Sequence, residues 1–397
     1  MSSTARIPRP RLTAVLRDDD RVSPLELFFD LVFVLALTQC TALMAHEPSW
    51  TGLAKGLAVL GVMWWAWVGY TWTCSTLDPE EGSVRLVMFA AMAALLIVAL
   101  AIPQAFGDEA LIFALAYGFV RAMQVALLVI GGRDDPGLRH SAYGLAVSTA
   151  IGVGLLTAAA FADGTLQGAL WAIALTLDVG GPLVIDSSGW RLMPEHFAER
   201  HGLIVIIALG ESIVAIGVGA EVIGVTAGVA ACAVLGIAVA GALWWLYFDV
   251  VALVAARRLG NAAPGKEQNE IGRDSFSYLH FPMVAGIVLL ALGLKKTLEH
   301  TDEALKLVPA TALLGGAALY LLAHVAFRWR NIHTLNRQRL AMAIGLPLLI
   351  PLAVEVPALA ALAGLAALLV GLVAYEVTRF GEARERLRRR LLHGEAG

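Results

Sequence analysis

Long apolar segments run through this chain of 397 residues and limit the folds that are open to it. Apolar residues make up 58% of the sequence and charged residues 15%, whereas a soluble globular protein has about 25% charged residues. In lipid, a segment of roughly 20 apolar residues satisfies its backbone hydrogen bonds by forming a helix. Composition and segment length therefore predict an all-α polytopic membrane protein whose main partner is the lipid bilayer.

Twelve transmembrane helices are predicted from these segments. They cover approximately residues 24–45, 52–73, 85–105, 109–131, 140–162, 165–186, 194–219, 226–256, 276–296, 307–329, 339–354 and 357–380. The eighth segment is long for one helix, so we expect it to tilt or to break around Gly236 and Gly241.

Positive charge alternates between the connections. The connections on one side of the predicted helices carry 24 Lys and Arg residues, and those on the other side carry four. Because Lys and Arg are retained on the cytoplasmic side of a membrane, both termini are predicted to be cytoplasmic. An odd number of helices would break this alternation, which favours twelve.

Landmarks recur in the two halves of the chain in the same order. Met63-Trp64-Trp65 returns as Leu243-Trp244-Trp245, Tyr117 and Arg121 return as Tyr320 and His324, and Asp178-Val179 aligns with Glu376-Val377. Six helices per half place both halves in the same orientation, which predicts two parallel six-helix repeats. The expected parts are a cytoplasmic N-terminal segment (1–23), a first repeat (24–190), a second repeat (191–380) and a basic cytoplasmic tail (381–397).

Seven ionisable side chains within the predicted helices are the candidates for polar groups inside the membrane: Asp30, Arg121, Asp178, Glu211, Asp249, His280 and His324. A charge near the centre of a bilayer costs roughly 2.5–3.5 kcal/mol, so each needs a reason. We predict that these residues line a transport pathway, with several of them in one polar layer of the inner third. The alternative is that they pair among themselves and fix the register of the helices.

Other sequence features exclude several kinds of site. Ser23-Pro24-Leu25-Glu26 has the form of a capping box, which gives Glu26 a structural role at the start of the first helix. Three scattered cysteines and the histidines lack the spacing of a metal site, so no metal and no cofactor are predicted. A net charge of −3 argues against nucleic acid as a partner.

Three segments resemble the signature segments of the bacterial low temperature requirement A (LtrA) membrane proteins. They are Glu26-Leu-Phe-Phe-Asp30-Leu-Val-Phe-Val, Glu199-Arg-His-Gly202 leading into Ala208-Leu-Gly-Glu211-Ser212, and Tyr278-Leu-His280-Phe-Pro282. The resemblance covers residues from about 20 to 380 and implies a multi-pass protein of the bacterial inner membrane. It points to Glu26, Asp30, His201, Glu211 and His280 as candidate site residues.

The first helix is also similar to the lysosomal potassium channel family, which carries a Phe-x-Asp motif in the first helix of each six-helix repeat. Phe28-Phe29-Asp30 fits that motif in the first repeat, but Gly202 stands at the matching position of the second. This departure weakens the case for a channel.

The leading functional hypothesis is a secondary transporter of a small solute or ion, with buried carboxylates in its pathway. The alternatives are an ion channel with six-helix repeats and a non-transporting membrane scaffold or sensor. No nucleophile with a nearby base is evident, so the chain is not predicted to be an enzyme, although a membrane-embedded enzyme and a homo-oligomer stay open. A pocket lined by Asp30, Arg121, Glu211 and Asp249 would favour transport, and local pairing of every buried charge would favour a scaffold.

Overall fold

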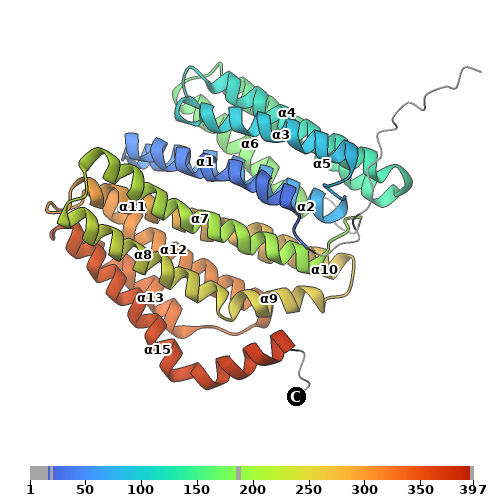
Figure 1. The fold of residues 1–397 in the computed structure, drawn as a ribbon. Coiled ribbons are helices and arrows are strands. Elements are labelled where there is room, and N and C mark those ends of the chain that lie inside the picture. The colour runs from blue at the N-terminus through green and yellow to red at the C-terminus, as the bar shows by residue number, and fades with distance from the viewer. Residues whose placement is uncertain (1–16, 18–20, 185–188, 394–397) are drawn as a thin grey trace, which may run out of the picture.

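The computed structural model describes Arg17, residues 21–184 and residues 189–393, and every regular element within these residues is helical (Figure 1). By length and composition, 11 helices or continuous helical runs in this part of the chain could cross a membrane. The all-α, multi-pass fold class is therefore confirmed.

The first half of the chain forms six long helices that match the predicted segments to within a few residues. They are α1 (Pro24–His46), α2 (Trp50–Thr76), α3 (Gly82–Ala101), α4 (Ala110–Gly131), α5 (Pro136–Ala159) and α6 (Gly164–Val184), with 3-10 turns η1 (Ile102–Gln104) and η2 (Gly132–Asp134) after α3 and α4. In order along the chain, α1 packs against α2 and α3, α3 against α4, α4 against α5, and α5 against α6. The predicted end of the sixth segment, 185–186, lies outside the described residues.

The second half is more interrupted. Its helices are α7 (Pro194–Ile223), α8 (Ala227–Phe248), α9 (Val251–Gly260), α10 (Lys266–Ile271), the π-helical segment η3 (Gly272–Tyr278), α11 (His280–Glu299), α12 (Leu307–Ile332), α13 (Arg337–Leu348), α14 (Ile350–Ala353) and α15 (Ala358–His393). Here α7 packs against α8 and α11, α11 against α12, α12 against α13, and α8 against α15. The two halves meet where α1 contacts α7 and α11, and α1 and α7 lie side by side in the middle of Figure 1.

Two predicted helices differ in the structure. The predicted helix 339–354 is divided into α13 and α14 at Leu349, next to Pro347 and Pro351, which lack the N–H group that a continuous helix needs. Neither piece is long enough to cross a membrane alone, and this is why the count is 11 rather than 12.

The eighth predicted helix breaks at a different place from the one expected. The chain leaves helical geometry at Val250 (φ −138°, ψ −35°), between α8 and α9, and not at Gly236 or Gly241. Gly236 instead lies close to Ile216 of α7, where the absence of a side chain allows the two helices to approach.

Ion pairs and hydrogen bonds gather the arginine-containing connections at one end of the bundle. Arg330, in the last turn of α12, contacts Asp274 at 3.0 Å. Arg384 Nε of α15 lies 2.7 Å from Asp249. We call this the arginine-rich end; it comprises Arg17 and residues 257–273, 328–339 and 379–390. The segment predicted as a basic tail is, as far as His393, a continuation of α15.

Candidate functional site between α1 and α7

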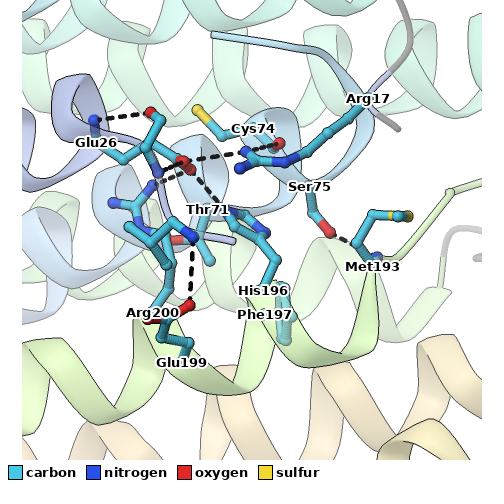
Figure 2. A network of polar contacts seen from close by, with 12 residues as sticks. Arg17, Glu26, Thr71, Cys74, Ser75, Met193, His196, Phe197, Glu199 and Arg200 are labelled. Atoms are coloured by element: carbon cyan, nitrogen blue, oxygen red, sulfur yellow. Dashed lines mark hydrogen bonds and ion pairs between the residues drawn. The ribbon is translucent and has the colours of Figure 1, made fainter. Parts of the chain in front are cut away.

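The first turn of α1 contains the predicted capping box. Ser23 Oγ accepts a hydrogen bond from the Glu26 backbone N–H at 3.3 Å, and Glu26 Oε2 accepts one from the Ser23 N–H at 2.9 Å. The same carboxylate is fully buried and has three further partners, since Arg17, His196 and Arg200 converge on it (Figure 2). The distances are 3.0 Å from Arg17 Nη1, 2.7 Å from His196 Nε2 and 3.1 Å from Arg200 Nη1. Glu26 therefore caps its helix and also holds an ionic cluster.

One turn deeper, Asp30 faces the same arginine. Glu26 and Asp30 are four residues apart on α1, and His196 and Arg200 are four residues apart on α7, so each pair lies on one helix face. Arg200 donates a hydrogen bond from Nη1 to Glu26 and another from Nη2 to Asp30 Oδ1. Trp67 of α2 donates its indole N–H to the same Asp30 oxygen at 2.9 Å. Two carboxylates thus face two arginines in a buried site, and their charges balance when His196 is neutral.

His201 extends the site toward α11. Its ring lies 5.0 Å from Trp67 and 5.1 Å from His280, measured between ring centroids. His201 Nδ1 lies 2.8 Å from the Phe197 carbonyl oxygen, which can only accept, so this nitrogen carries the proton. In the neutral ring Nε2 is then a free acceptor. We call Glu26, Asp30, His196, Arg200 and His201 the α1–α7 cluster.

His280 has the same tautomer. Its Nδ1 donates to the Ser275 carbonyl of η3 at 3.0 Å, which leaves Nε2 to accept from the Tyr247 hydroxyl at 2.8 Å. The π-helical turn before α11 therefore supplies a backbone partner for this side chain, in keeping with the frequent use of such turns at functional sites.

Four buried polar atoms of the α1–α7 cluster have no hydrogen-bond partner among the described residues. They are Asp30 Oδ2, His196 Nδ1, Arg200 Nε and His201 Nε2. Buried polar atoms are normally satisfied by protein or by ordered water, and leaving them unsatisfied is costly. The cluster therefore has spare capacity to bind water, an ion or a proton.

Glu211 lies farther along α7, in the same line of contact between α1 and α7, which we call the α1–α7 seam. It is buried, and its Oε2 is 2.5 Å from the Thr38 hydroxyl of α1. Thr38 Oγ1 is in turn 3.0 Å from the Val34 carbonyl oxygen. Within the described part of the chain, no Lys, Arg or His lies within ion-pair distance of this carboxylate, in contrast to Glu26 and Asp30.

Two of the three signature segments thus meet across the α1–α7 seam, and the third places His280 beside them. Residues 21–374 match the family described as bacterial low temperature requirement A protein (LtrA). The chain belongs to the LtrA family. A protein of Rhizobium meliloti (strain 1021), described as uncharacterized, is 32% identical over 317 residues, which cover 77% of this chain and 76% of that protein. No solved structure matches the chain. Family membership and the apolar helices together identify a multi-pass integral membrane protein.

In this LtrA protein a second buried pair lies within the first half. Arg121 of α4 contacts Asp178 of α6 at 3.1 Å, and the Tyr117 hydroxyl donates to the other Asp178 oxygen at 2.8 Å. Arg121 also donates to Thr149 at 3.0 Å and to the Trp65 carbonyl of α2 at 3.2 Å. This arginine therefore connects four helices of the first half.

A third cluster lies within the second half of the chain. Arg339 of α13 binds Glu376 of α15 with two nitrogens, at 2.8 and 2.7 Å, and donates to the Leu246 carbonyl of α8 at 2.9 Å. Its Nη1 also lies 3.0 Å from His324 Nδ1, which must be the acceptor nitrogen of that ring. Arg384 then joins Glu376, at 3.0 Å, to Asp249 at the break between α8 and α9.

Asp30, Arg121, Glu211 and Asp249, whose common pocket would have favoured transport, lie in separate groups in the structure. Asp30 and Glu211 share the interface between α1 and α7 but lie at different points along it, whereas Arg121 pairs with Asp178 of α6 and Asp249 with Arg384 of α15. Arg121 lines a cavity of about 70 Å³ together with residues such as Gln124 and Arg273, and none of the other three borders it. In the described residues no group of three or more His, Cys, Asp or Glu side chains is placed to hold a metal ion.

Several buried ionic residues of this LtrA protein were not among the sequence candidates. Arg200 and His196 stand close to the start of α7, where charged residues are ordinarily solvated, and Arg339 stands in an arginine-containing connection. The signal that could have identified the first two is their four-residue spacing, which matches that of Glu26 and Asp30 on the first helix. Glu376 was noted only as the counterpart of Asp178.

Proposed function

We propose that this LtrA protein is a proton-coupled secondary transporter of a small solute or ion, in which Glu211 binds the coupling proton. The observation that carries the proposal is the contact of Glu211 with Thr38. A transporter needs a group that changes its protonation at an interface between two parts of the protein, and Glu211 is a buried carboxyl group at such an interface.

The hydrogen-bond geometry favours the protonated form of Glu211. Thr38 has one hydroxyl proton and two acceptors within reach, Glu211 Oε2 at 2.5 Å and the Val34 carbonyl at 3.0 Å. When Glu211 carries a proton, it donates to Thr38 and Thr38 donates to Val34, so every group is satisfied. When Glu211 is ionised, it competes with Val34 for the Thr38 proton. Thr41 of α1 also reaches this carboxyl group, and its hydroxyl donates to the Leu37 carbonyl at 3.1 Å, so it faces the same competition; Lys295 of α11 is a nearby positive charge.

This competition couples the protonation of Glu211 to the contact between α1 and α7. Loss of the proton places an uncompensated charge between α1 and α7 and removes a hydrogen bond from the α1 backbone. In low dielectric both changes are costly, and a shift of one half against the other that admits water or a cation would relieve them. The unpartnered atoms of the α1–α7 cluster provide a second place where water or an ion could bind.

Similar helix packing in the two halves supports a duplicated fold, and a duplicated fold supports the transporter proposal. With α1 matched to α7, α2 to α8, α3 to α11 and α4 to α12, the packing of α1 on α2, α1 on α3 and α3 on α4 recurs as α7 on α8, α7 on α11 and α11 on α12. Asp178 and Glu376, which align in sequence, are each held by an arginine that also donates to a backbone carbonyl of the second helix of its half. In transporters built from repeats, the binding sites lie at the interface of the repeats.

We further propose the inner membrane as the location, with the arginine-rich end in the cytoplasm. The connections at this end hold most of the Lys and Arg residues, and such connections are retained on the cytoplasmic side. Both termini would then be cytoplasmic.

The proposal is tested in proteoliposomes that contain a trapped pH-sensitive dye. A panel of amino acids, monocarboxylates and inorganic cations is added outside, and proton movement is recorded for the wild type, Glu211→Gln and Glu221→Gln. Glu221 is the matched control because it is an exposed glutamate of the same helix. A solute that moves protons in the wild type and in Glu221→Gln, but not in Glu211→Gln, is the expected result. Equal proton movement in all three proteins would contradict the role of Glu211.

A static membrane scaffold is the second candidate, and one observation favours it. Among the described residues, Asp30, Asp178, Asp249 and Glu376 are each paired with an arginine, as fixed structural locks would be. This candidate predicts no solute-dependent proton movement in any of the three proteins.

A further inference from the structure

A cavity of about 420 Å³ opens at the arginine-rich end of the second half. It lies between the α8–α9 junction, α12, the start of α13 and the polar part of α15. Its charged lining consists of Arg328, Arg337, Arg339, Arg384 and Glu376. A cavity of this size with so many cations is suited to an anionic ligand.

The charges of this cavity do not cancel. Arg339 and Arg384 are paired with Glu376 and Asp249. Arg328 is half-buried, its Nε donates to the Thr334 hydroxyl at 3.0 Å, and among the described residues no carboxylate lies within ion-pair distance of it or of Arg337. The cavity therefore holds two cations in excess.

The start of α13 adds to this positive potential. Asn336 caps the helix by accepting from the Arg339 N–H at 3.1 Å, and Arg337 and Gln338 of the first turn border the cavity. The N-terminal end of a helix carries partial positive charge and favours an anion. The helix end and the two arginines thus act on the same space.

An apolar groove continues from this cavity. Gln338 borders both the arginine-lined cavity and a groove of about 670 Å³ between α13 and α15. Leu346, Leu368 and Leu372 line the groove, together with small residues such as Gly345 and Gly371. In the first half the corresponding helices, α5 and α6, pack closely against each other, whereas α13 and α15 are linked by Arg339 and Glu376 and have the groove between them. The second half therefore leaves an apolar channel where the first half has direct helix contact.

We propose that these two neighbouring spaces form a binding site for a phospholipid with an anionic headgroup. The headgroup phosphate binds at Arg328 and Arg337, and one acyl chain lies in the groove between α13 and α15. Clustered arginines next to apolar helix surfaces are the chemistry by which membrane proteins retain anionic lipids. The bound lipid would connect α12, α13 and α15, which carry the Arg339–Glu376 lock.

The test uses the purified full-length protein in neutral detergent, with apparent melting temperature as the readout. Titrations use short-chain phosphatidylglycerol, short-chain phosphatidylcholine and inorganic phosphate. Stabilisation by phosphatidylglycerol at concentrations at least tenfold below those needed for phosphatidylcholine is expected, with little effect of phosphate. The Arg328→Gln/Arg337→Gln double variant should weaken the phosphatidylglycerol effect at least tenfold. Arg386→Gln, at an exposed arginine of α15 outside the cavity lining, should leave it unchanged.

A second variant separates a lipid from a free phosphate. A side chain at Gly345 would enter open space, because no atom lies within 4 Å of a Cβ built there, so Gly345→Leu should fill the groove without disturbing α13. If a lipid binds, Gly345→Leu weakens the phosphatidylglycerol effect. Stabilisation by inorganic phosphate that is equal in Gly345→Leu and the wild type would replace the lipid with a phosphate anion and overturn the proposal. Equal effects of the two lipids in the wild type and in the double variant would also overturn it.

Discussion

Arg200 of α7 donates to Asp30 of α1, and the same guanidinium contacts Glu26 one helical turn away, at 3.1 Å from its Nη1. One arginine thus contacts two carboxylates across the seam between the two halves of the chain, and Arg17 supplies the second positive charge. The guanidinium carbon also lies over the ring of Trp67, 5.5 Å from its centroid. These contacts fix the position of α1 against α7, and Glu211 lies farther along the same seam.

The Asp30–Arg200 pair should make a large contribution to stability. Removing one partner of a buried ion pair leaves the other charge uncompensated and typically costs about 3–5 kcal/mol. We expect Asp30→Asn and Arg200→Gln each to lower the stability by this amount, and the double variant to cost less than the sum. A double-mutant cycle on denaturant unfolding in detergent measures the coupling. Arg330→Gln, which removes a partly exposed pair with Asp274, should cost no more than about 1 kcal/mol.

Glu26 has two roles that substitutions can separate. Ser23→Ala removes only the cap and should cost about 1 kcal/mol. Glu26→Gln retains a side chain that can complete a capping box, but it leaves Arg17 and Arg200 without one negative charge, and we expect a loss of about 3–5 kcal/mol. Equal losses in the two variants, measured by tryptophan fluorescence during thermal unfolding, would mean that Glu26 acts as a cap alone.

The contacts that Arg339 makes with α8, α12 and α15 should depend on its planar guanidinium group. Arg339 uses all three of its nitrogens, for Glu376, the Leu246 carbonyl and His324, and a lysine ammonium cannot reproduce this arrangement. Arg339→Lys should therefore destabilise the protein by about 2 kcal/mol or more, as expected for lost charge-assisted hydrogen bonds. The control is Arg389→Lys at an exposed pair with Glu385, where no measurable change is expected. A melting temperature unchanged in both variants would remove the argument for a lock.

Glu211→Gln should preserve the fold while it abolishes proton coupling. A neutral glutamine amide can donate to Thr38 as the protonated carboxyl group does, so the melting temperature should stay within about 1 °C of the wild type, which corresponds to less than about 1 kcal/mol for a protein of this size. A strong loss of stability in this variant would show that the ionised form is the native one.

The sequence was sufficient for the parts of the structure that depend on local pattern. Apolar length located α1 to α7 closely, and the capping box at Ser23 defined the first residue of α1. It was insufficient where a break depends on tertiary contacts. The bend after Phe248 occurs beside Asp249, whose partner Arg384 lies far away in the sequence, and not at a glycine.

The ion-pair partners of the buried carboxylates could not be predicted either, because they too depend on tertiary contacts. Helical periodicity places Glu26 and Asp30 on one face of α1, but it does not say that this face meets His196 and Arg200. The sequence predicts a polar layer that includes several acidic residues, but it does not say that Asp30 and Asp178 belong to separate ion pairs, one with Arg200 and one with Arg121. Residues near helix ends, such as Arg200, were overlooked because the burial of a helix start depends on the connections that cover it.

The protonation of Glu211 is the central claim, and infrared spectroscopy of the protein in lipid at neutral pH measures it directly. A protonated buried carboxyl group gives a carbonyl stretching band that is separate from the bands of carboxylates and amides. The account predicts that this band is present in the wild type and in Glu221→Gln and that its Glu211 component disappears in the spectrum of Glu211→Gln. Loss of a carboxylate band in Glu211→Gln, with the carboxyl band unchanged, would contradict it.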